Sequence, residues 1–169
     1  MKEEMEALEA IRKRRSVREY TGEGVPREDL EKIVDAGRLA ATGYNRQPWD
    51  FIVVTEKAMI EQLKVAAQWM DKTGAIIAVV IDPSSEWWVE DGSAAVENML
   101  IASTALGYGS CWLEGDTKPH EEEFKKLLDI PKDKRLLTLI PIGVPVSWPT
   151  VEKKSLEEVL HWEKYGSTK

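Results

Sequence analysis

The sequence predicts a single α+β domain, and three observations support that prediction. Two runs rich in β-branched and aromatic residues, 50–55 and 75–81, are typical of strands. Segments with apolar residues at helical spacing lie before, between and after these runs. The length of 169 residues suits one domain and allows a core without metals or disulfides. We therefore expect one domain, residues 1–169, that contains both helices and strands.

The first half of the chain is expected to hold three helices and two strands. A first helix covers about residues 2–14, because acidic residues come first and arginines last, as the helix dipole favours. Its apolar stripe comprises Met5, Leu8 and Ile11. A second helix begins near Pro26 and stops near Gly43. Its apolar face comprises Leu30, Ile33, Val34, Gly37 and Ala41. A third helix, between the two strands, is marked by Ile60, Leu63, Ala67 and Met70. The continuous apolar run 75–81 indicates a buried central strand.

The second half begins with a polar loop, 82–90, that contains Trp87 and Trp88. Segment 92–106 is apolar nearly all round, which predicts a helix buried on most sides and ended by Gly107. A short strand, 109–113, an amphipathic helix, 121–128, and another strand, 136–144, follow. The inward side chains of the amphipathic helix are Phe124, Leu127 and Leu128. Pro141 indicates that the last strand lies near an edge or a bulge. The tail, 145–169, has a short helix around 156–161 and too little apolar surface for its own core, so we expect it to lie against something else, such as a second subunit.

Composition excludes several classes of function. The net charge of −7 argues against a general affinity for nucleic acid. No apolar run reaches the ~18–20 residues that span a bilayer, and the N-terminus has no apolar signal core. One cysteine, Cys111, cannot form an internal disulfide, which fits a cytoplasmic protein. No cysteine or histidine spacing predicts a metal site. We expect Cys111 to be a buried strand thiol, and we expect no catalytic role for His120 or His161.

A basic motif, Arg14-Arg15-Ser16-Val17-Arg18, stands out against the acidic background. It lies where the first helix ends and the chain becomes extended. Guanidinium groups make charge-assisted, often bidentate bonds to phosphate oxygens, and a serine hydroxyl adds a neutral donor. The alternatives are a solvated helix end that balances the dipole and an arm that binds nucleic acid.

Three more segments carry polar groups that suit a ligand. Segment 41–49 ends in Gln-Pro-Trp, and its Asn and Gln amides can pair with a heterocycle. Segment 105–115 has closely spaced glycines that let backbone approach a planar ligand. Lys153 and Lys154 precede the short C-terminal helix and could complete an anion site. Structural alternatives are an ordinary loop, a helix stop with a tight turn, and surface charges.

Together these segments resemble the FMN-dependent nitroreductase family. The motifs Arg-Arg-Ser-x-Arg, Asn-x-Gln-Pro-Trp and Gly-x-Gly-Ser-Cys-Trp occur in the family's order, and Leu-Glu-Glu-Val-Leu-His-Trp-Glu near the end is similar too. Each motif is weak, but four in order over essentially the whole chain are specific. The resemblance implies a three-layer α-β-α sandwich with a mixed central sheet flanked by helices. It also implies a C-terminal tail that crosses to the partner subunit.

The resemblance also implies a cofactor site at a homodimer interface, with no catalytic side chain required. It assigns Arg14, Arg15 and Ser16 to the phosphate and ribityl region of FMN, and Arg18 to the N1/O2 edge of the flavin. A loop from the other subunit would supply Gly43, Tyr44, Asn45 and Gln47. The backbone along the isoalloxazine would be that of Trp112, Leu113, Glu114 and Gly115. Lys153 and Lys154 would complete the phosphate site. Many members have Pro-Ser where this chain has Ala41-Thr42, although Thr42 keeps the hydroxyl. Segment 82–90 matches no family pattern.

The activity that the resemblance implies is hydride transfer from NAD(P)H through flavin N5 to an electron-poor acceptor, such as a nitroaromatic, a quinone or an enal. A flavin-binding or storage protein is an alternative. Another is a family relative that acts on flavin itself or on halogenated aromatics. The donor (NADH, NADPH or a deazaflavin) and the physiological acceptor are left open by the sequence.

Overall fold

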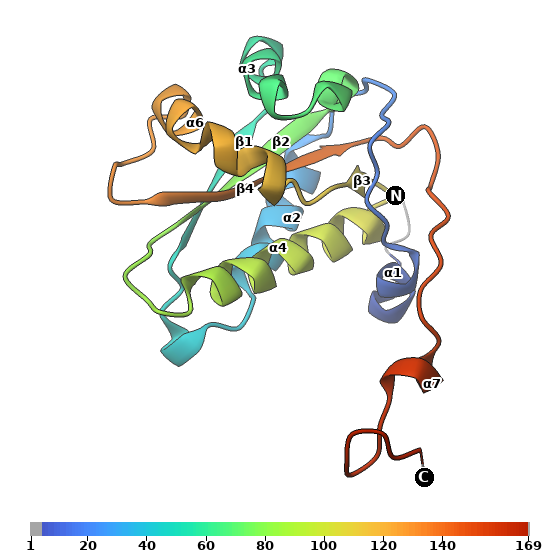
Figure 1. Cartoon of the computed structure of the whole chain (residues 1–169). Helices are drawn as coiled ribbons and strands as arrows, with labels where there is room; N and C mark the ends of the chain where they lie inside the picture. Colours follow the sequence, from blue (N-terminus) through green and yellow to red (C-terminus); the bar gives the residue numbers. More distant parts are fainter. Residues whose placement is uncertain (1–4, 169) are drawn as a thin grey trace.

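A four-stranded sheet forms the middle layer of the protein in the computed structural model, which describes residues 5–168 (Figure 1). The strands lie in the order β1-β2-β4-β3, and all three neighbouring pairs are antiparallel. Their bounds are Trp49–Val54 for β1, Ala75–Ile81 for β2, Gly109–Ser110 for β3 and Arg135–Gly143 for β4. A mixed sheet was expected, whereas all pairs of neighbouring strands in the structure are antiparallel. Within residues 5–168 its parallel pairing is limited to a bridge between Ser16 and Ser110.

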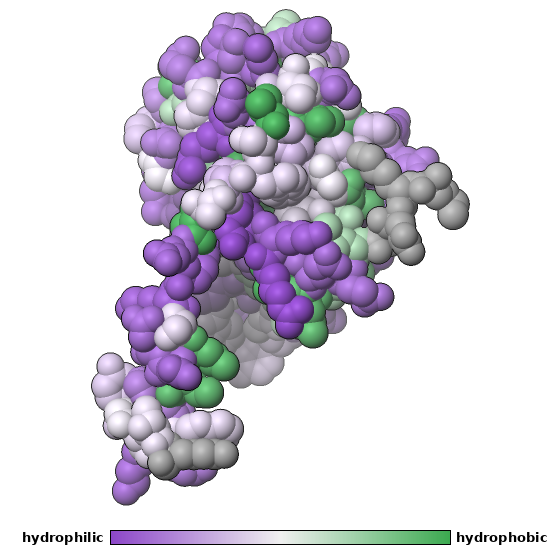
Figure 2. Space-filling model, turned by 90° about the vertical axis from the view of Figure 1, so that its right-hand side faces the viewer, coloured by the Kyte–Doolittle hydropathy of each residue, from purple (hydrophilic) through white to green (hydrophobic). Residues whose placement is uncertain are grey.

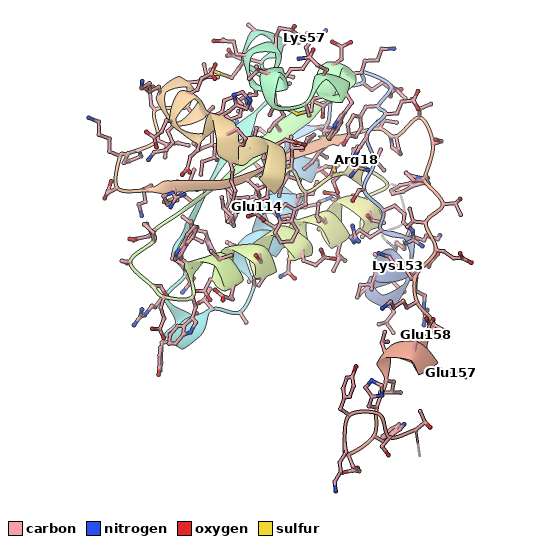
Figure 3. The ribbon with its side chains drawn as sticks, viewed as in Figure 1. Arg18, Lys57, Glu114, Lys153, Glu157 and Glu158 are labelled. Atoms are coloured by element: carbon pink, nitrogen blue, oxygen red, sulfur yellow. The ribbon has the colours of Figure 1, made fainter. Side chains whose placement is uncertain are left out.

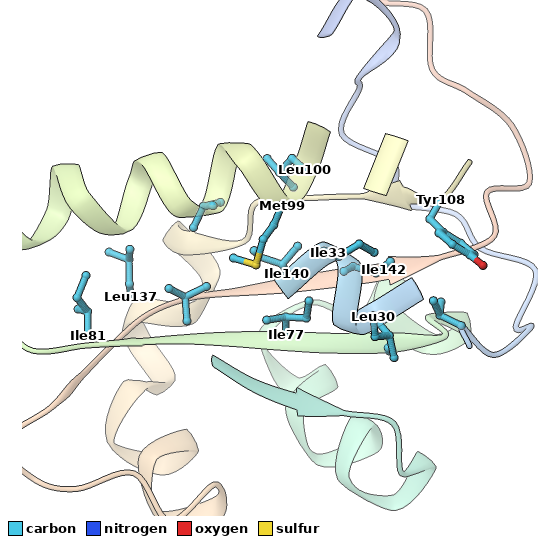
Figure 4. Packing of buried hydrophobic residues seen from close by; sticks show 14 residues of the cluster. Leu30, Ile33, Ile77, Ile81, Met99, Leu100, Tyr108, Leu137, Ile140 and Ile142 are labelled. Atoms are coloured by element: carbon cyan, nitrogen blue, oxygen red, sulfur yellow. The ribbon is translucent and has the colours of Figure 1, made fainter. Parts of the chain in front are cut away.

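Helices cover both faces of this sheet, which confirms the predicted α-β-α sandwich (Figure 1). Helices α2 (Arg27–Arg38) and α4 (Trp88–Ala105) lie on one face, and α3 (Lys57–Leu63) and α6 (Glu121–Leu127) lie on the other. Alternate residues of β2 enter the two cores: Ile77 belongs to the first and Ile76 to the second. Figure 4 shows Met99 of α4 pointing towards the sheet in the first core, to which Leu100 also belongs. Every residue of β2 is buried, as its continuous apolar run predicted.

Pro141 lies in β4 beside the two-residue edge strand β3, which fits the expectation that this strand lies near an edge or a bulge. Strand β4 runs between β2 and β3. The Pro141 carbonyl accepts hydrogen bonds from the Cys111 N–H at 3.3 Å and the Tyr20 hydroxyl at 3.2 Å. A residue in an antiparallel strand turns its N–H and C=O towards the same neighbour. The missing N–H of Pro141 therefore faces β3, which pairs with β4 at only two residues. The irregularity in the β2–β4 register lies elsewhere, between Val79 and Val80.

Several helix boundaries differ from the prediction. The third helix ends at Leu63 and continues as two 3-10 turns, Lys64–Ala66 and Gln68–Lys72, because Ala67 between them has extended backbone. The four residues that marked it are nevertheless buried. Helix α2 ends at Arg38, well before Gly43. Helix α4 begins at Trp88, which packs against the core, so the preceding loop stops at Trp87. Gly107 has a φ of +83° and ends that helix as expected.

The strand expected over 109–113 is shorter, since β3 stops at Ser110 and the chain then contacts β4 only through single bonds, such as that from the Leu113 N–H to the Leu139 carbonyl. Helix α5 (Glu114–Thr117) follows directly. The bounds of α6 and of β4 each agree with the predicted bounds to within one residue at both ends.

Two apolar surfaces face away from the body. Helix α1 (Ala7–Lys13) buries Ala10 against α4, while Leu8 and Ile11 of its predicted stripe point outward with 66% and 51% exposure. Residues 2–4 of the expected first helix lie outside the described residues. The tail leaves the body and carries the small helix α7 (Leu156–Val159), shorter than expected. Figure 2 shows it projecting, with hydrophobic side chains gathered along part of it. Its exposed hydrophobic residues include Leu156, Val159, Leu160, Trp162 and Tyr165.

None of the helices between Met5 and Thr168 is both long and apolar enough to cross a lipid bilayer.

Candidate functional site

The basic motif runs as an extended segment along the end of the sheet. Its fourth residue, Val17, is 1% exposed, and the Val17 N–H donates to the Ser110 carbonyl at 3.0 Å. The Tyr20 hydroxyl donates to the Val17 carbonyl at 2.9 Å. With Val17 held inward, the neighbouring side chains of Ser16 and Arg18 are directed to the opposite side, as alternation along an extended chain requires.

The first residues of the tail pair with the same segment. The Val146 N–H donates to the Glu19 carbonyl at 3.1 Å, and the Thr21 N–H donates to the Val144 carbonyl at 3.0 Å. These two bonds bring the tail next to the basic motif, although the two segments are far apart in the sequence. Figure 3 shows Arg18 and Lys153 on the same side of the molecule.

A cavity of about 550 Å³ lies between the two segments. That volume is within the range of small-molecule sites. Its lining residues are Arg14, Arg15, Ser16, Arg18, Glu19, Ser147, Pro149, Val151 and Lys153. The cavity therefore unites the predicted phosphate residues with Lys153, while Lys154 is exposed and does not line it.

The positive charge in this cavity is only partly neutralised. Arg14 forms an ion pair with Glu97 at 3.1 Å. Arg15 donates through Nη1 to two backbone carbonyls at 2.7 and 2.8 Å, and its Nε is buried without a hydrogen-bond partner. The Arg18 guanidinium lies 6.0 Å from the Trp69 ring centroid. Within residues 5–168, Arg15, Arg18 and Lys153 form no ion pair with a carboxylate. An orphaned guanidinium N–H beside unpaired cations fits a phosphate group, which accepts such bonds strongly.

Cys111 lies beneath the motif and is 2% exposed. Burial raises the pKa of its thiol, and this effect outweighs the opposite influence of Arg18 and of a hydrogen bond with Ser16. Since the thiolate is the nucleophilic form, Cys111 is poorly suited to act as a nucleophile at neutral pH. The expectation of a buried thiol is confirmed, although β3 stops at Ser110, one residue before Cys111.

The segment 112–115 continues directly from Cys111. Trp112 is half-buried, and its indole Nε1 is buried without a partner. The Leu113 side chain is in the core, so only its backbone could face a ligand. Glu114 pairs with Lys118 at 2.6 Å. Gly115 is exposed, and a β-carbon there would meet nothing within 4 Å, which leaves room for a planar group beside the backbone.

The loop that carries Gly43, Tyr44, Asn45 and Gln47 lies far from this cavity. The Gly43 N–H donates to Asp91 in the first turn of α4 at 2.9 Å, whereas Arg14 pairs with Glu97 further along the helix and α1 packs near its far end. Figure 1 shows the loop and α1 at opposite ends of α4. One chain therefore does not bring all the predicted cofactor residues together.

This loop is strained. Tyr44, Asn45 and Gln47 have φ values of 52°, 55° and 50°, a region that side-chain-bearing residues seldom adopt. Such conformations persist where surrounding contacts hold them, and they are frequent at functional sites. Asparagine adopts positive φ more readily than most residues, but Tyr44 and Gln47 do not, so their conformation was not predictable from the sequence.

Four lining residues were missed by sequence reasoning: Glu19, Ser147, Pro149 and Val151. Three of them lie in the tail, whose low apolar content revealed no binding role. Their closeness to Lys153 in the sequence was the available signal. No group of histidine, cysteine or acidic residues in the described part of the chain could hold a metal ion.

Comparison with known proteins decides the family. The model of the Nitroreductase family matches residues 11–81 and 66–144, which together contain the basic motif, the strained loop and the whole sheet. This chain belongs to the nitroreductase family. The matched region is most of the chain and contains three of the four motifs, while the fourth, at residues 156–163, lies beyond it.

Relatives of this nitroreductase-family chain extend over nearly its full length. A protein of Archaeoglobus fulgidus, named as an NADH dehydrogenase/NAD(P)H nitroreductase, is 38% identical over 83% of this chain and 86% of its own. A crystal structure from Bacteroides thetaiotaomicron, with a similar name, has a TM-score of 0.86 and 30% identity, and covers 94% of this chain and 98% of its own. A Bacteroides fragilis nitroreductase structure with bound FMN has a TM-score of 0.77 and 25% identity, with 98% of each chain covered.

Proposed function

We propose that this chain is an FMN-dependent oxidoreductase that uses NAD(P)H to reduce electron-poor acceptors. The observation that carries the proposal is the cavity lined by Arg15, Ser16 and Lys153. In the described part of the chain, Arg15 and Lys153 form no ion pair, and the buried Nε of Arg15 has no hydrogen-bond partner. Family membership and the names of the relatives supply the redox class and the donor.

The phosphate end of the cofactor would be held by Arg14, Arg15 and Ser16, with Lys153 closing the site. FMN held there would supply the two-electron chemistry, that is, hydride transfer through N5 from NAD(P)H to a nitroaromatic, a quinone or an enal. Arg18 would place its charge near N1/O2, where it stabilises the reduced, anionic cofactor. The backbone of 112–115 would lie along the isoalloxazine, with Lys154 outside the cavity as a weaker contributor to the field.

The site is completed, in this proposal, by a second copy of the chain. The loop with Tyr44, Asn45 and Gln47 lies at the opposite end of α4 from the cavity, so a partner must supply it. The outward stripe of α1 and the apolar side chains of the tail offer surface for such a partner, because exposed apolar patches commonly mark interfaces. The tail would cross onto that partner.

Two measurements test the oxidoreductase. Purified protein should show flavin absorption, and NADH or NADPH added without oxygen should bleach it, with re-oxidation by menadione or 4-nitrobenzyl alcohol. A yellow protein that is not reduced by either donor would favour flavin storage. Reduction with release of iodide from an iodinated phenol, but with no turnover of quinone or nitro acceptors, would favour the halogen-removing alternative.

The dimer has its own test. Sedimentation should give twice the mass of the chain, and Leu156→Asp together with Leu160→Asp should shift the protein towards monomer. Ser167→Asp in the same tail is the matched control. A wild-type monomer that binds FMN at full strength would contradict the shared site.

A further inference from the structure

The strained loop holds an arginine that the family resemblance does not use. Arg46 is exposed, and its guanidinium lies 5.7 Å from the ring centroid of Tyr44 and 5.9 Å from that of Trp87. The two rings lie 5.7 Å apart, tilted by 46°. Stacking on aromatic faces orients an arginine while its N–H groups stay available for an anion.

This cluster is held in place from below. The Gly43 N–H is bonded to Asp91, and the Gln47 N–H donates to the Thr42 hydroxyl at 3.2 Å. A β-carbon on Gly43 would lie 2.6 Å from the Trp87 ring, so the loop backbone and this tryptophan are in close contact. The loop backbone at Gly43 therefore packs directly against Trp87, a residue in the segment that matched no family pattern.

Arg46 also differs from most of its fellow arginines in having no acidic partner. Arg14, Arg27, Arg38 and Arg135 each pair with a carboxylate, whereas Arg46 pairs with none in the described part of the chain. The nearby Asp91 is 5% exposed and is bonded to the Gly43 N–H. An oriented, unpaired guanidinium beside the exposed ring of Tyr44 suits a planar ligand with an anionic substituent.

We infer that Arg46, held on Tyr44 and Trp87, binds the oxyanion group of a substrate that enters the flavin site. The inference rests on the proposed function, in which this loop reaches the flavin of the partner subunit. The oxyanion belongs either to an aromatic acceptor, as a carboxylate, or to NADPH, as its 2′-phosphate. Arg46 is a binding residue for substrate and takes no part in electron transfer.

The experiment measures dissociation constants by calorimetry on the oxidised flavoprotein. The probes are 4-nitrobenzoate against the neutral 4-nitrobenzyl alcohol, and an analogue of NADPH against the corresponding analogue of NADH, both unable to donate hydride to the flavin. Arg46→Gln removes the charge, Arg46→Lys keeps the charge but not the bidentate, stacked geometry, and Arg38→Gln is the matched control on the surface of α2. We expect Arg46→Gln to weaken the binding of 4-nitrobenzoate or of the NADPH analogue about tenfold relative to the counterpart that lacks the oxyanion in question, as for loss of one charge-assisted bond. Arg46→Lys should give a smaller loss.

Loss of preference for 4-nitrobenzoate places the oxyanion on the acceptor, and loss of preference for the NADPH analogue places it on the donor. If both ratios in Arg46→Gln match those of Arg38→Gln, the inference is wrong. Failure of the proposed function is recognised separately, since the wild-type protein would then lack flavin or would not turn over the neutral nitro compound with either donor.

Discussion

Val17 lies so close over Gly109 that a β-carbon on this glycine would come within 2.7 Å of the valine Cβ and Cγ1 atoms. Val17 is almost fully buried, and its N–H donates to the carbonyl of Ser110, the residue after Gly109. The short strand β3 therefore acts as the support on which the basic motif is laid. Sequence neighbours of Val17 line the cavity, so the position of the cavity depends on the absence of a side chain at Gly109.

Gly109→Ala should lower the free energy of unfolding by about 1–3 kcal/mol, the usual cost of overpacking a filled site. It should also weaken FMN retention, because the clash displaces the motif. Denaturant unfolding and flavin content after gel filtration measure the two effects. Gly24→Ala is the control, since a β-carbon there meets nothing within 4 Å. Equal stability of the two variants would show that Val17 can move without cost.

Arg14→Ala should weaken FMN binding by about tenfold to a hundredfold, the loss expected for a charge-assisted hydrogen bond to phosphate. Riboflavin, which lacks the phosphate, should lose much less. Dissociation constants of both flavins for the apoprotein are measured by fluorescence quenching. Arg12→Ala, an exposed arginine outside the cavity, serves as control. Equal losses for FMN and riboflavin would mean that Arg14 does not contact the phosphate.

Arg18→Ala should lower the midpoint potential of bound FMN and slow its reduction by NAD(P)H. A unit charge ~4 Å away is worth roughly 4 kcal/mol at an effective dielectric constant of ~20. Because Arg18 is exposed and screened, we expect a shift on the order of tens of millivolts. Equilibration with reference dyes gives the potential. Arg18→Lys should restore most of it, and an unchanged potential in Arg18→Ala would remove this role from Arg18.

Glu121→Gln should destabilise the protein at pH 7 by about 1–2 kcal/mol, because Glu121 accepts two hydrogen bonds from Arg135 at 2.7 and 2.8 Å. It also accepts the Leu136 N–H at 3.1 Å. The Arg135 bonds hold the pKa of Glu121 below its ordinary value of 4.5. A depressed folded-state pKa contributes stability above pH 4.5 that is lost as the pH falls through the folded value.

The difference between wild type and Glu121→Gln should accordingly shrink as the pH is lowered from 7 towards 3. Urea unfolding at several pH values measures it, with the exposed Glu152→Gln as control. A difference that stays constant over this range would show that the ionised carboxylate is not what stabilises the fold.

Cys111 should react slowly with a thiol reagent such as DTNB in the native protein and rapidly after unfolding in guanidinium. Burial limits access of the reagent to the thiol. Burial also raises the pKa of Cys111 above its ordinary value of 9.0, which keeps the thiol protonated at neutral pH. Stopped-flow absorbance measures the rate, and Cys111→Ser supplies the blank. Rapid reaction of Cys111 with DTNB in the native protein at pH 7 would argue that the chain next to β3 opens easily.

The sequence by itself determined the layers of this protein and the family to which it belongs. The continuous apolar run of β2 could only be a strand covered on both faces, and the apolar segment of α4 could only be a buried helix. Motif order alone predicted the nitroreductase family, because each motif depends on residues that are local in the chain.

Tertiary structure decided where those motifs lie. The outward direction of Leu8 and Ile11, the interior place of Pro141 and the break at Ala67 depend on contacts with segments far away in the sequence. The same is true of the cavity between Arg15 and Lys153, which exists because the tail pairs with residues 19–21. Helical periodicity shows that one side of a helix is apolar, but packing against the rest of the molecule determines which side is buried.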